Sequence, residues 1–284
     1  MRWNKPIVIL TLFLSWISFS CLSHKKNNLQ QVFDRQEQYV SSGQLQLAID
    51  GYNQALADYP NEARILDNYI RTVENTKDAA EKAYVARNYF HALKVYTILL
   101  DNFHYFQTFR NSLSFDQDFL SLKRKNCRIA INEIQVNNAI KSDNYVKAIG
   151  SYQLLFHDYH NDRSLNQSFS KTVSSIYQRG ETAFKNDDLL ASGRINYALL
   201  KNHDLIERSD LFFPFSNSSL QERLRVCRDN LTKKGLEYYR KGDLKKAIST
   251  WKGILEFDPE NVEIKKAIKN SEDQLKKIKK ESQI

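Results

Sequence analysis

Residues that form turns are scarce in this chain. It contains 8 glycines and 4 prolines among 284 residues, roughly a third of the number expected from average usage. A β-sandwich or β-barrel needs a turn roughly every ten residues, so the composition argues against both architectures. Low complexity is also excluded, because hydrophobic residues make up 42% of the chain and aromatic residues 12%, enough to build a core. We therefore expect an all-α fold of helices joined by short polar turns.

Acidic residues are absent from the first 28 positions, which carry four basic residues. A second basic excess lies in residues 221–284, with 17 basic and 11 acidic side chains, so the body between is close to neutral although the formal charge is +9. The lysines near the C-terminus alternate with glutamates, as on a solvated helix face. This distribution, together with the export signal described next, predicts no nucleic-acid partner.

The N-terminus has the pattern of an export signal. Arg2 and Lys5 precede an apolar stretch from Pro6 to Phe19. Its 14 residues are fewer than the roughly 20 that a membrane-spanning helix needs, but they suit the apolar region of a signal peptide. We therefore predict a signal peptide over residues 1–20 and a short linker over residues 21–28.

Cleavage is predicted after Ser20, because small residues stand at the −1 and −3 positions of that bond, the latter being Ser18. The arrangement resembles a bacterial lipoprotein signal, which implies that Cys21 becomes the first residue and carries diacylglycerol and an N-linked acyl chain such as palmitate. Two alternatives remain open. Ordinary secretory cleavage would release a soluble protein, and an uncleaved anchor would use the apolar run as far as Leu22. All three place residues 29–284 outside the cytoplasm, and the first tethers them to a membrane of the bacterial cell envelope, facing the periplasm or the exterior.

A 34-residue frame organises the C-terminal part of the chain. Its positions 8, 11, 15, 20, 24 and 32 are Gly235, Tyr238, Gly242, Ala247, Trp251 and Pro259. Small residues at 8 and 20 let two antiparallel helices approach closely, aromatics fill the space beside the crossing, and the proline ends the second helix. This pattern resembles the tetratricopeptide repeat, which implies a helix–turn–helix unit. A second unit starts near Leu29 and matches at Tyr39, Gly43, Ala48, Tyr52, Ala55 and Pro60, but it has Gln36 at position 8.

Three weaker units follow the same small-then-aromatic pattern. They begin at Ala92 with Tyr96 and Leu99, at Ala148 with Tyr152 and Leu155, and at Gly193 with Tyr197 and Leu200. The five small anchors are spaced by alternating shorter and longer intervals, and each anchor lies about 100 residues from the next but one. Phe115, Leu120, Cys127 and Arg128 also recur 100 residues later. We therefore expect a duplicated module of about 100 residues, and we expect Cys127 and Cys227 to be buried free thiols, too far apart to pair.

The resemblance implies an α–α superhelix, a solenoid of about five helix pairs over residues 29–259. Residues 260–284 are predicted to form a capping helix with an apolar stripe at Ile264, Ile268, Ser271, Leu275 and Ile278. Its charged face is expected either to be solvated or to contact anionic lipid or peptidoglycan. Aromatic residues gather in two connectors, 103–119 and 211–215. They either pack beneath the helices as core or line the concave face and anchor a partner, in which case Phe212 and Phe213 would bind it.

Repeat arrays of this kind bind other proteins over extended surfaces without performing chemistry. The resemblance therefore predicts a non-enzymatic scaffold or adaptor with protein partners, no cofactor and no small-molecule substrate. Its groove residues are expected on first helices, at Arg35, Gln38, Asn137, Lys141, Lys234 and Glu237. The alternative is an envelope hydrolase acting on peptidoglycan, or its accessory subunit, with a helical superhelix. The Glu-Ser catalytic motif of the helical lytic transglycosylases has no match here.

Signs of catalytic or metal chemistry are few. Phosphate-binding glycine loops, His-Glu-x-x-His and Gly-x-Ser-x-Gly motifs are absent from the sequence. His157 and His160 stand three residues apart in a polar cluster, but a metal site wants three or four convergent ligands. We therefore expect no catalytic residues and no metal.

The lipoprotein signal makes a prediction about mass. Protein extracted from membranes should begin at Cys21 and its N-terminal peptide should carry the mass of the added acyl groups, as measured by mass spectrometry. An unmodified N-terminus at Cys21 would favour ordinary secretory cleavage, and an intact Met1 would favour the uncleaved anchor.

Overall fold

The computed structural model describes residues 29–159, 162–209 and 211–281. Within these ranges the chain is helical and has no strand, so the all-α prediction is confirmed there. Cys21, the predicted signal peptide and the linker lie outside the described residues. Internal contacts divide the chain into two units, the first ending at Ala130 and the second beginning at Ile131. The division falls within helix α5 (Gln117–Lys141).

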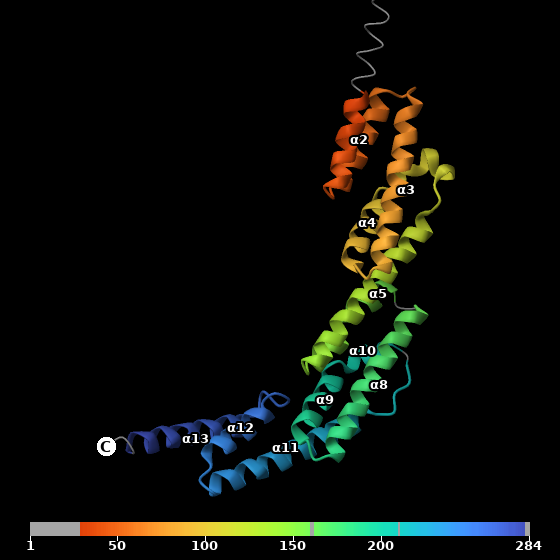
Figure 1. Ribbon diagram of the computed structural model, residues 1–284. Coiled ribbons are helices and arrows are strands. Elements are labelled where there is room, and N and C mark those ends of the chain that lie inside the picture. The colour runs from red at the N-terminus through yellow and green to blue at the C-terminus, as the bar shows by residue number, and fades with distance from the viewer. Residues whose placement is uncertain (1–28, 160–161, 210, 282–284) are drawn as a thin grey trace, which may run out of the picture. The chain divides into compact units, whose positions relative to one another are not determined.

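The first unit contains a helix over residues 29–41. It is followed by α2 (Leu45–Asp58), α3 (Ala63–Val85), α4 (Tyr89–Asp101), the 3₁₀ helix η1 (Phe103–Ser112) and the start of α5. The second unit contains the rest of α5, α6 (Tyr145–Gly150), α7 (Gln153–Tyr159), α8 (Arg163–Lys185), α9 (Leu189–Lys201), α10 (His203–Arg208), α11 (Asn217–Arg240), α12 (Leu244–Ile254) and α13 (Val262–Glu281). Figure 1 shows these helices in chain order.

One tight turn closes each of five helix pairs. In every case a residue in the left-handed region ends the first helix, with φ between 55° and 78°; these residues are Gly43, Arg87, Asp143, Asp187 and Gly242. The amide of the next residue donates a hydrogen bond of 2.8 or 2.9 Å to the carbonyl five residues back, which is the six-to-one bond of a Schellman motif. The next residue is also the N-cap of the second helix. At four of the five turns it is Asn or Asp, and its side chain accepts a hydrogen bond from the backbone N–H three residues later.

Helix bounds recur at an offset of 100 residues. Helix α8 starts and ends 100 residues after α3, α9 does so after α4, and α11 starts 100 residues after α5. An ion pair recurs as well: Lys123 lies 3.0 Å from Glu81, and Arg223 lies 3.1 Å from Glu181. The structure thus has the module length that the sequence spacing predicts.

The structure corrects one anchor of that spacing. Four residues after their N-caps, the second helices carry Ala48, Ala92, Ala148, Ser192 and Ala247, which are all fully buried. The sequence placed this position at Gly193, one residue too late, because serine is also small enough to sit at a helix crossing. With Ser192 as the anchor, equivalent anchors are 100, 100 and 99 residues apart, from Ala48 to Ala148, from Ala92 to Ser192 and from Ala148 to Ala247. Gly193 instead faces Phe257, whose ring a Cβ would overlap.

Helix pairs approach each other at small residues, as predicted. In the last pair Gly235 of α11 lies against the indole of Trp251, which is 2% exposed, and a Cβ at Gly235 would overlap that ring. The first pair has the arrangement reversed. Its buried Gln36 occupies the place of Gly235, and Gly51 on the opposite helix leaves room for it.

The aromatic connectors belong mainly to the core. Phe103, Phe106, Phe109 and Phe115 are buried in the first unit. In the second unit Phe213 is buried and its ring stacks on Phe215 at 5.6 Å. The two residues that the sequence analysis paired therefore differ, because the neighbouring Phe212 is 93% exposed.

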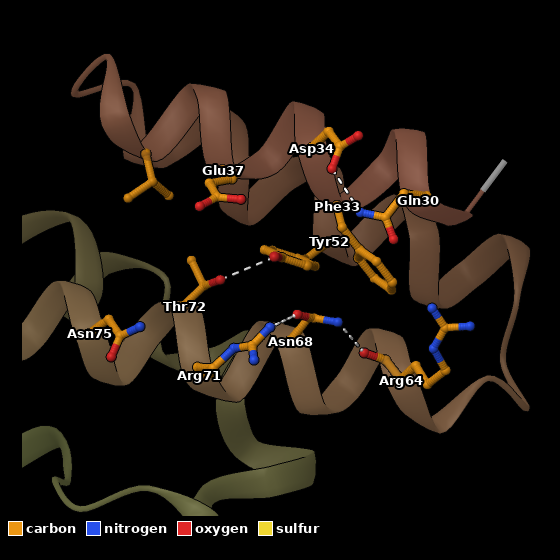
Figure 2. Close-up of a pocket in the computed structure, with 11 residues that line it drawn as sticks. Gln30, Phe33, Asp34, Glu37, Tyr52, Arg64, Asn68, Arg71, Thr72 and Asn75 are labelled. Carbon is orange, nitrogen blue, oxygen red and sulfur yellow. Dashed lines mark hydrogen bonds between the residues drawn. The ribbon is translucent and has the colours of Figure 1, made fainter. Parts of the chain in front are cut away.

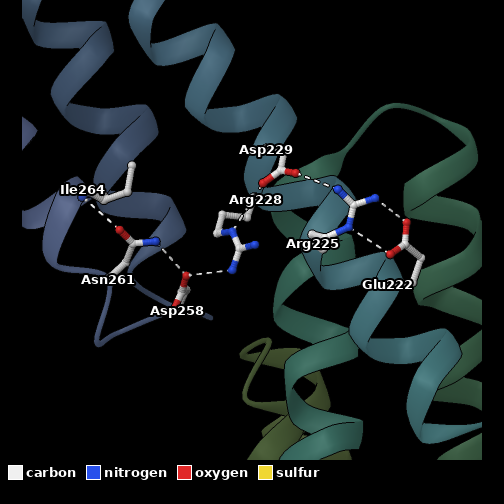
Figure 3. Close-up of polar contacts among 7 residues, drawn as sticks. All are labelled: Glu222, Arg225, Arg228, Asp229, Asp258, Asn261 and Ile264. Atoms are coloured by element: carbon white, nitrogen blue, oxygen red, sulfur yellow. Dashed lines mark hydrogen bonds and ion pairs between the residues drawn. The ribbon is translucent and has the colours of Figure 1, made fainter.

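Helix α13 begins in a polar network that Figure 3 shows. Asn261 accepts the amide of Ile264 at 3.0 Å and donates to Asp258 at 2.8 Å, and Asp258 pairs with Arg228 of α11 at 3.5 Å. From this start the predicted stripe packs on α12: Ile264, Ile268 and Ser271 are buried, and Leu275 is half-buried. Ile278, the last stripe residue, is 49% exposed.

Cys127 and Cys227 are free and buried, as predicted. Burial raises the pKa of the Cys127 thiol to about 11 and raises that of Cys227 as well. Within the described part of the chain, no helix has the length and apolar character needed to cross a membrane.

The contact between Gly235 and Trp251 predicts the effect of one methyl group. Gly235→Ala should lower the free energy of unfolding by about 1 to 3 kcal/mol, because the added Cβ forces the indole out of its packed position. Gly150→Ala is the matched control, since its Cβ meets only the side-chain oxygen of Asn202 at 3.2 Å. Urea unfolding followed by circular dichroism measures both. Equal stabilities for the two variants would contradict the packing described here.

Candidate partner-binding grooves

A groove runs between the helix of residues 29–41 and α3, and we call it the first groove. It encloses about 540 Å³ and is shown in Figure 2. Its lining residues are Gln30, Phe33, Asp34, Glu37, Val40, Tyr52, Arg64, Asn68, Arg71, Thr72 and Asn75. The groove lies wholly within the first unit.

The floor of the first groove is a buried tyrosine. Tyr52 comes from α2, is 3% exposed and stacks on Tyr69 with ring centroids 4.8 Å apart. Its hydroxyl lies 3.0 Å from the Thr72 hydroxyl of α3, as the dashed line in Figure 2 marks. Burial raises the pKa of Tyr52, so the floor stays neutral and can both donate and accept hydrogen bonds.

The two walls of this groove carry opposite charges. Asp34 and Glu37 stand on the helix of residues 29–41, and Arg64 and Arg71 stand on α3. The Arg64 guanidinium lies 5.6 Å from the centroid of the Phe33 ring. All four charged side chains belong to exposed residues, and Figure 2 shows the two acidic residues and the two arginines on different helices, with Tyr52 between them. The groove therefore offers carboxylates on one wall and guanidinium groups on the other.

The second unit contains a corresponding groove, which we call the second groove. It encloses about 240 Å³ between the C-terminal part of α5 and α8. Its lining residues are Glu133, Val136, Asn137, Ile140, Tyr152, Ser168, Lys171, Thr172 and Ser175. Eight of these nine stand 100 residues after a residue that lines the first groove.

The floor has the same chemistry in both grooves. Tyr152 is 1% exposed, and its hydroxyl lies 2.9 Å from that of Thr172 and 3.0 Å from that of Ser168. Ser168 in turn donates to Glu133 on the α5 wall at 3.2 Å. The walls differ, because Glu133 replaces Phe33 and Asn137 replaces Glu37. The second groove thus keeps the floor and changes the side chains that a bound molecule would meet.

The predicted groove residues lie close to these linings, but only one belongs to them. Asn137 lines the second groove. Arg35, Gln38 and Lys141 are exposed and lie outside the linings, each one or two positions from a lining residue. One residue along a helix turns the side chain by about 100°, which moves it off the face that forms the groove.

The remaining predicted residues line neither groove and lie elsewhere in the second unit. Lys234 and Glu237 are exposed on α11 and line neither groove. Phe212 is exposed and Phe213 is core. The second helical wall and the Tyr–Thr floor were not predicted from the sequence. Their signal was present in the sequence, since Tyr52 and Thr72 recur as Tyr152 and Thr172.

No group of three or more His, Cys, Asp or Glu side chains in the described residues is placed to hold a metal ion. His157 is exposed, and its Nδ1 lies 2.9 Å from the carboxylate of Asp158. His160, the second histidine of the polar cluster, lies outside the described residues.

A comparison of the chain with models of known protein families, with curated proteins and with solved structures finds no significant match.

The hydroxyl pairs on the groove floors predict a measurable contribution to stability. Tyr52→Phe and Tyr152→Phe keep the ring but remove the hydroxyl, so each should lower the free energy of unfolding by about 1 kcal/mol. Tyr152→Phe should cost more, because that hydroxyl has two partners. Urea unfolding compares both with Tyr105→Phe, a 46% exposed control. An effect no larger than the control's would show that the floors are not held by these bonds.

Proposed function

We propose that this chain is a non-enzymatic protein-interaction scaffold of the bacterial cell envelope, built as a tetratricopeptide-type solenoid of helix pairs. It is tethered to the membrane through acylated Cys21, and each groove binds a segment of a partner protein. The observation that carries the proposal is the groove built twice on equivalent residues, with the same buried Tyr–Thr floor.

The character of the linings favours a polypeptide over a small molecule. Sites for small molecules are mostly apolar, with a few polar groups, whereas these grooves are lined mainly by polar and charged side chains. A peptide presents both donors and acceptors along its backbone, and exposed amide, hydroxyl and charged groups on two helical walls can satisfy them. Binding of extended segments is also the general use of stacked helical repeats.

The charges of the first groove narrow the class of partner. A segment that lies along it meets Asp34 and Glu37 on one side and Arg64 and Arg71 on the other. A partner segment with both acidic and basic side chains can pair with both walls, whereas a segment of one sign is repelled by one of them. We therefore propose a partner segment of mixed charge for the first groove.

The envelope location rests on the N-terminal pattern. A lipid on Cys21 would hold the helical part at a membrane surface, and residues 21–28 would act as its tether. Because association with a partner on the same membrane becomes effectively intramolecular, modest affinity at each groove is sufficient. Two grooves on one chain can bind two segments of the same partner, which raises the overall affinity further.

Site-specific photo-crosslinking in envelopes tests the proposal. A photoreactive amino acid at Arg71 or Lys171, which occupy equivalent places in the two grooves, should crosslink to a partner protein. The matched controls are Gln54 and Leu154, exposed residues on second helices and also 100 residues apart. They should give little or no product. Crosslinking that is equal at all four positions, or absent from the grooves of a folded protein, would count against the scaffold.

A further inference from the structure

A second cavity of the first unit adjoins the first groove, and we call it the side pocket. It encloses about 210 Å³ where the turn after the first helix meets α3 and α4. Its apolar lining comes from Val40, Leu45, Ala79, Val95 and Ile98. Val40 and Asn75 also line the first groove, so the two cavities are neighbours.

The volume of the side pocket suits one aromatic ring. A dry apolar cavity of about 150 Å³ is enough to bind benzene. The walls provide aliphatic carbon, and polar groups stand at the edge, where Lys94 Nζ lies 3.4 Å from the Gly43 carbonyl oxygen and His91 is exposed. A ring with a hydroxyl could therefore place its carbon inside and its oxygen at the edge.

In the second unit, larger side chains occupy the positions equivalent to part of the side-pocket lining. At the position of Leu45 it has Tyr145, which is 6% exposed, and at the position of Gly43 it has Asp143, which accepts the Tyr145 hydroxyl at 2.7 Å. At the position of Ala79 it has Arg179, whose side chain also hydrogen-bonds this phenol. Three larger side chains thus stand where the first unit has glycine, leucine and alanine.

We infer that the side pocket of the first unit receives an aromatic side chain, tyrosine or phenylalanine, from the partner segment that lies in the first groove. The inference rests on the proposed function for the source of the ring. The fit of the ring rests on the pocket itself. Tyr145 in the second unit is the internal counterpart of the ring that a partner supplies in the first.

The pocket can be tested without knowing the partner. 4-Methylphenol, the side chain of tyrosine, is titrated into the full chain labelled at Leu, Val and Ile methyl groups. The methyl signals of Leu45, Val95 and Ile98 should shift saturably in the millimolar range. No saturable shift of these signals would overturn the inference.

Two substitutions taken from the second unit should fill the pocket. Leu45→Tyr and Ala79→Arg should each weaken the binding of 4-methylphenol about tenfold or more. Ala79 is exposed, so Ala79→Arg remains a valid test if Leu45→Tyr fails to fold. Ala57→Arg, at an exposed position of α2 outside the pocket, is the matched control for the added charge. Unchanged binding by Ala79→Arg and Leu45→Tyr would place the probe elsewhere and reject the pocket.

The reciprocal change should create a second site. Tyr145→Leu together with Arg179→Ala removes the two largest of the three side chains that stand in the corresponding place of the second unit and leaves Asp143. Saturable shifts at the Ile195 methyl groups, equivalent to those of Val95, should then appear with 4-methylphenol. Their absence in a folded variant would show that the two places are not equivalent.

Selection from a random peptide library separates this inference from the proposed function. Peptides that bind the full chain but not the Ala79→Arg variant should share an aromatic residue. Bound peptides without such a residue, unaffected by Ala79→Arg, would reject the side pocket and leave the scaffold standing. If 4-methylphenol binds as expected and no peptide is selected, the proposed function fails while the ring-binding pocket remains.

Discussion

The tight turn between the two helices of each pair is the constraint on which the rest of the structure depends. It needs a left-handed residue, which costs an ordinary side chain of the order of 1 kcal/mol, yet three of the five such residues are Arg87, Asp143 and Asp187. The six-to-one hydrogen bond and the N-cap that follows offset this cost by satisfying groups at two helix ends together. Because the N-cap directly follows the turn, the small residue four positions later always faces the first helix. The register of each pair is thereby set within about ten residues.

The groove floors follow from that register. Tyr52 stands four residues after Ala48 on α2, one turn further along the same face, and Tyr152 stands four residues after Ala148, in the turn between α6 and α7. They reach past the first helix of their own pair to a threonine on the first helix of the next, so each tyrosine joins two pairs. The hydroxyl is buried enough to raise the pKa of both tyrosines, but it remains bonded. A phenylalanine would fill the same space and leave the threonine hydroxyl without this partner.

Much of the helical order could be predicted from sequence, because it depends on local chemistry. Small anchors, aromatic residues and the 100-residue spacing located the five helix pairs that tight turns close in the described part of the chain. One anchor was predicted one residue too late. Serine stands there in place of alanine and a smaller glycine follows it, so a rule based on side-chain size selects Gly193 instead of Ser192. The groove residues were harder to predict. Arg35 and Gln38 are as polar as Asp34 and Glu37, and only the rotation of the helix against α3 decides which pair faces the groove. That rotation depends on contacts between residues far apart in sequence, such as Gln36 with Gly51.

The two units differ in their helix bounds, since α2 is continuous where the second unit has α6 and α7, and in the side chains at the turns and on the groove walls. The left-handed residue is glycine at two turns, aspartate at two and arginine at one, and glycine and aspartate tolerate that conformation best. At the equivalent side-pocket positions, the second unit uses this freedom to hold Tyr145 with Asp143, and the first unit leaves apolar space beside Gly43. Packing is tight at the helix crossings, where the volume of one added methyl group is not tolerated without rearrangement. Side chains can vary more freely along the groove walls and at the edge of the turn, so we expect differences in binding to arise there. A duplicated fold of this kind can therefore present two different surfaces on one framework without disturbing its core.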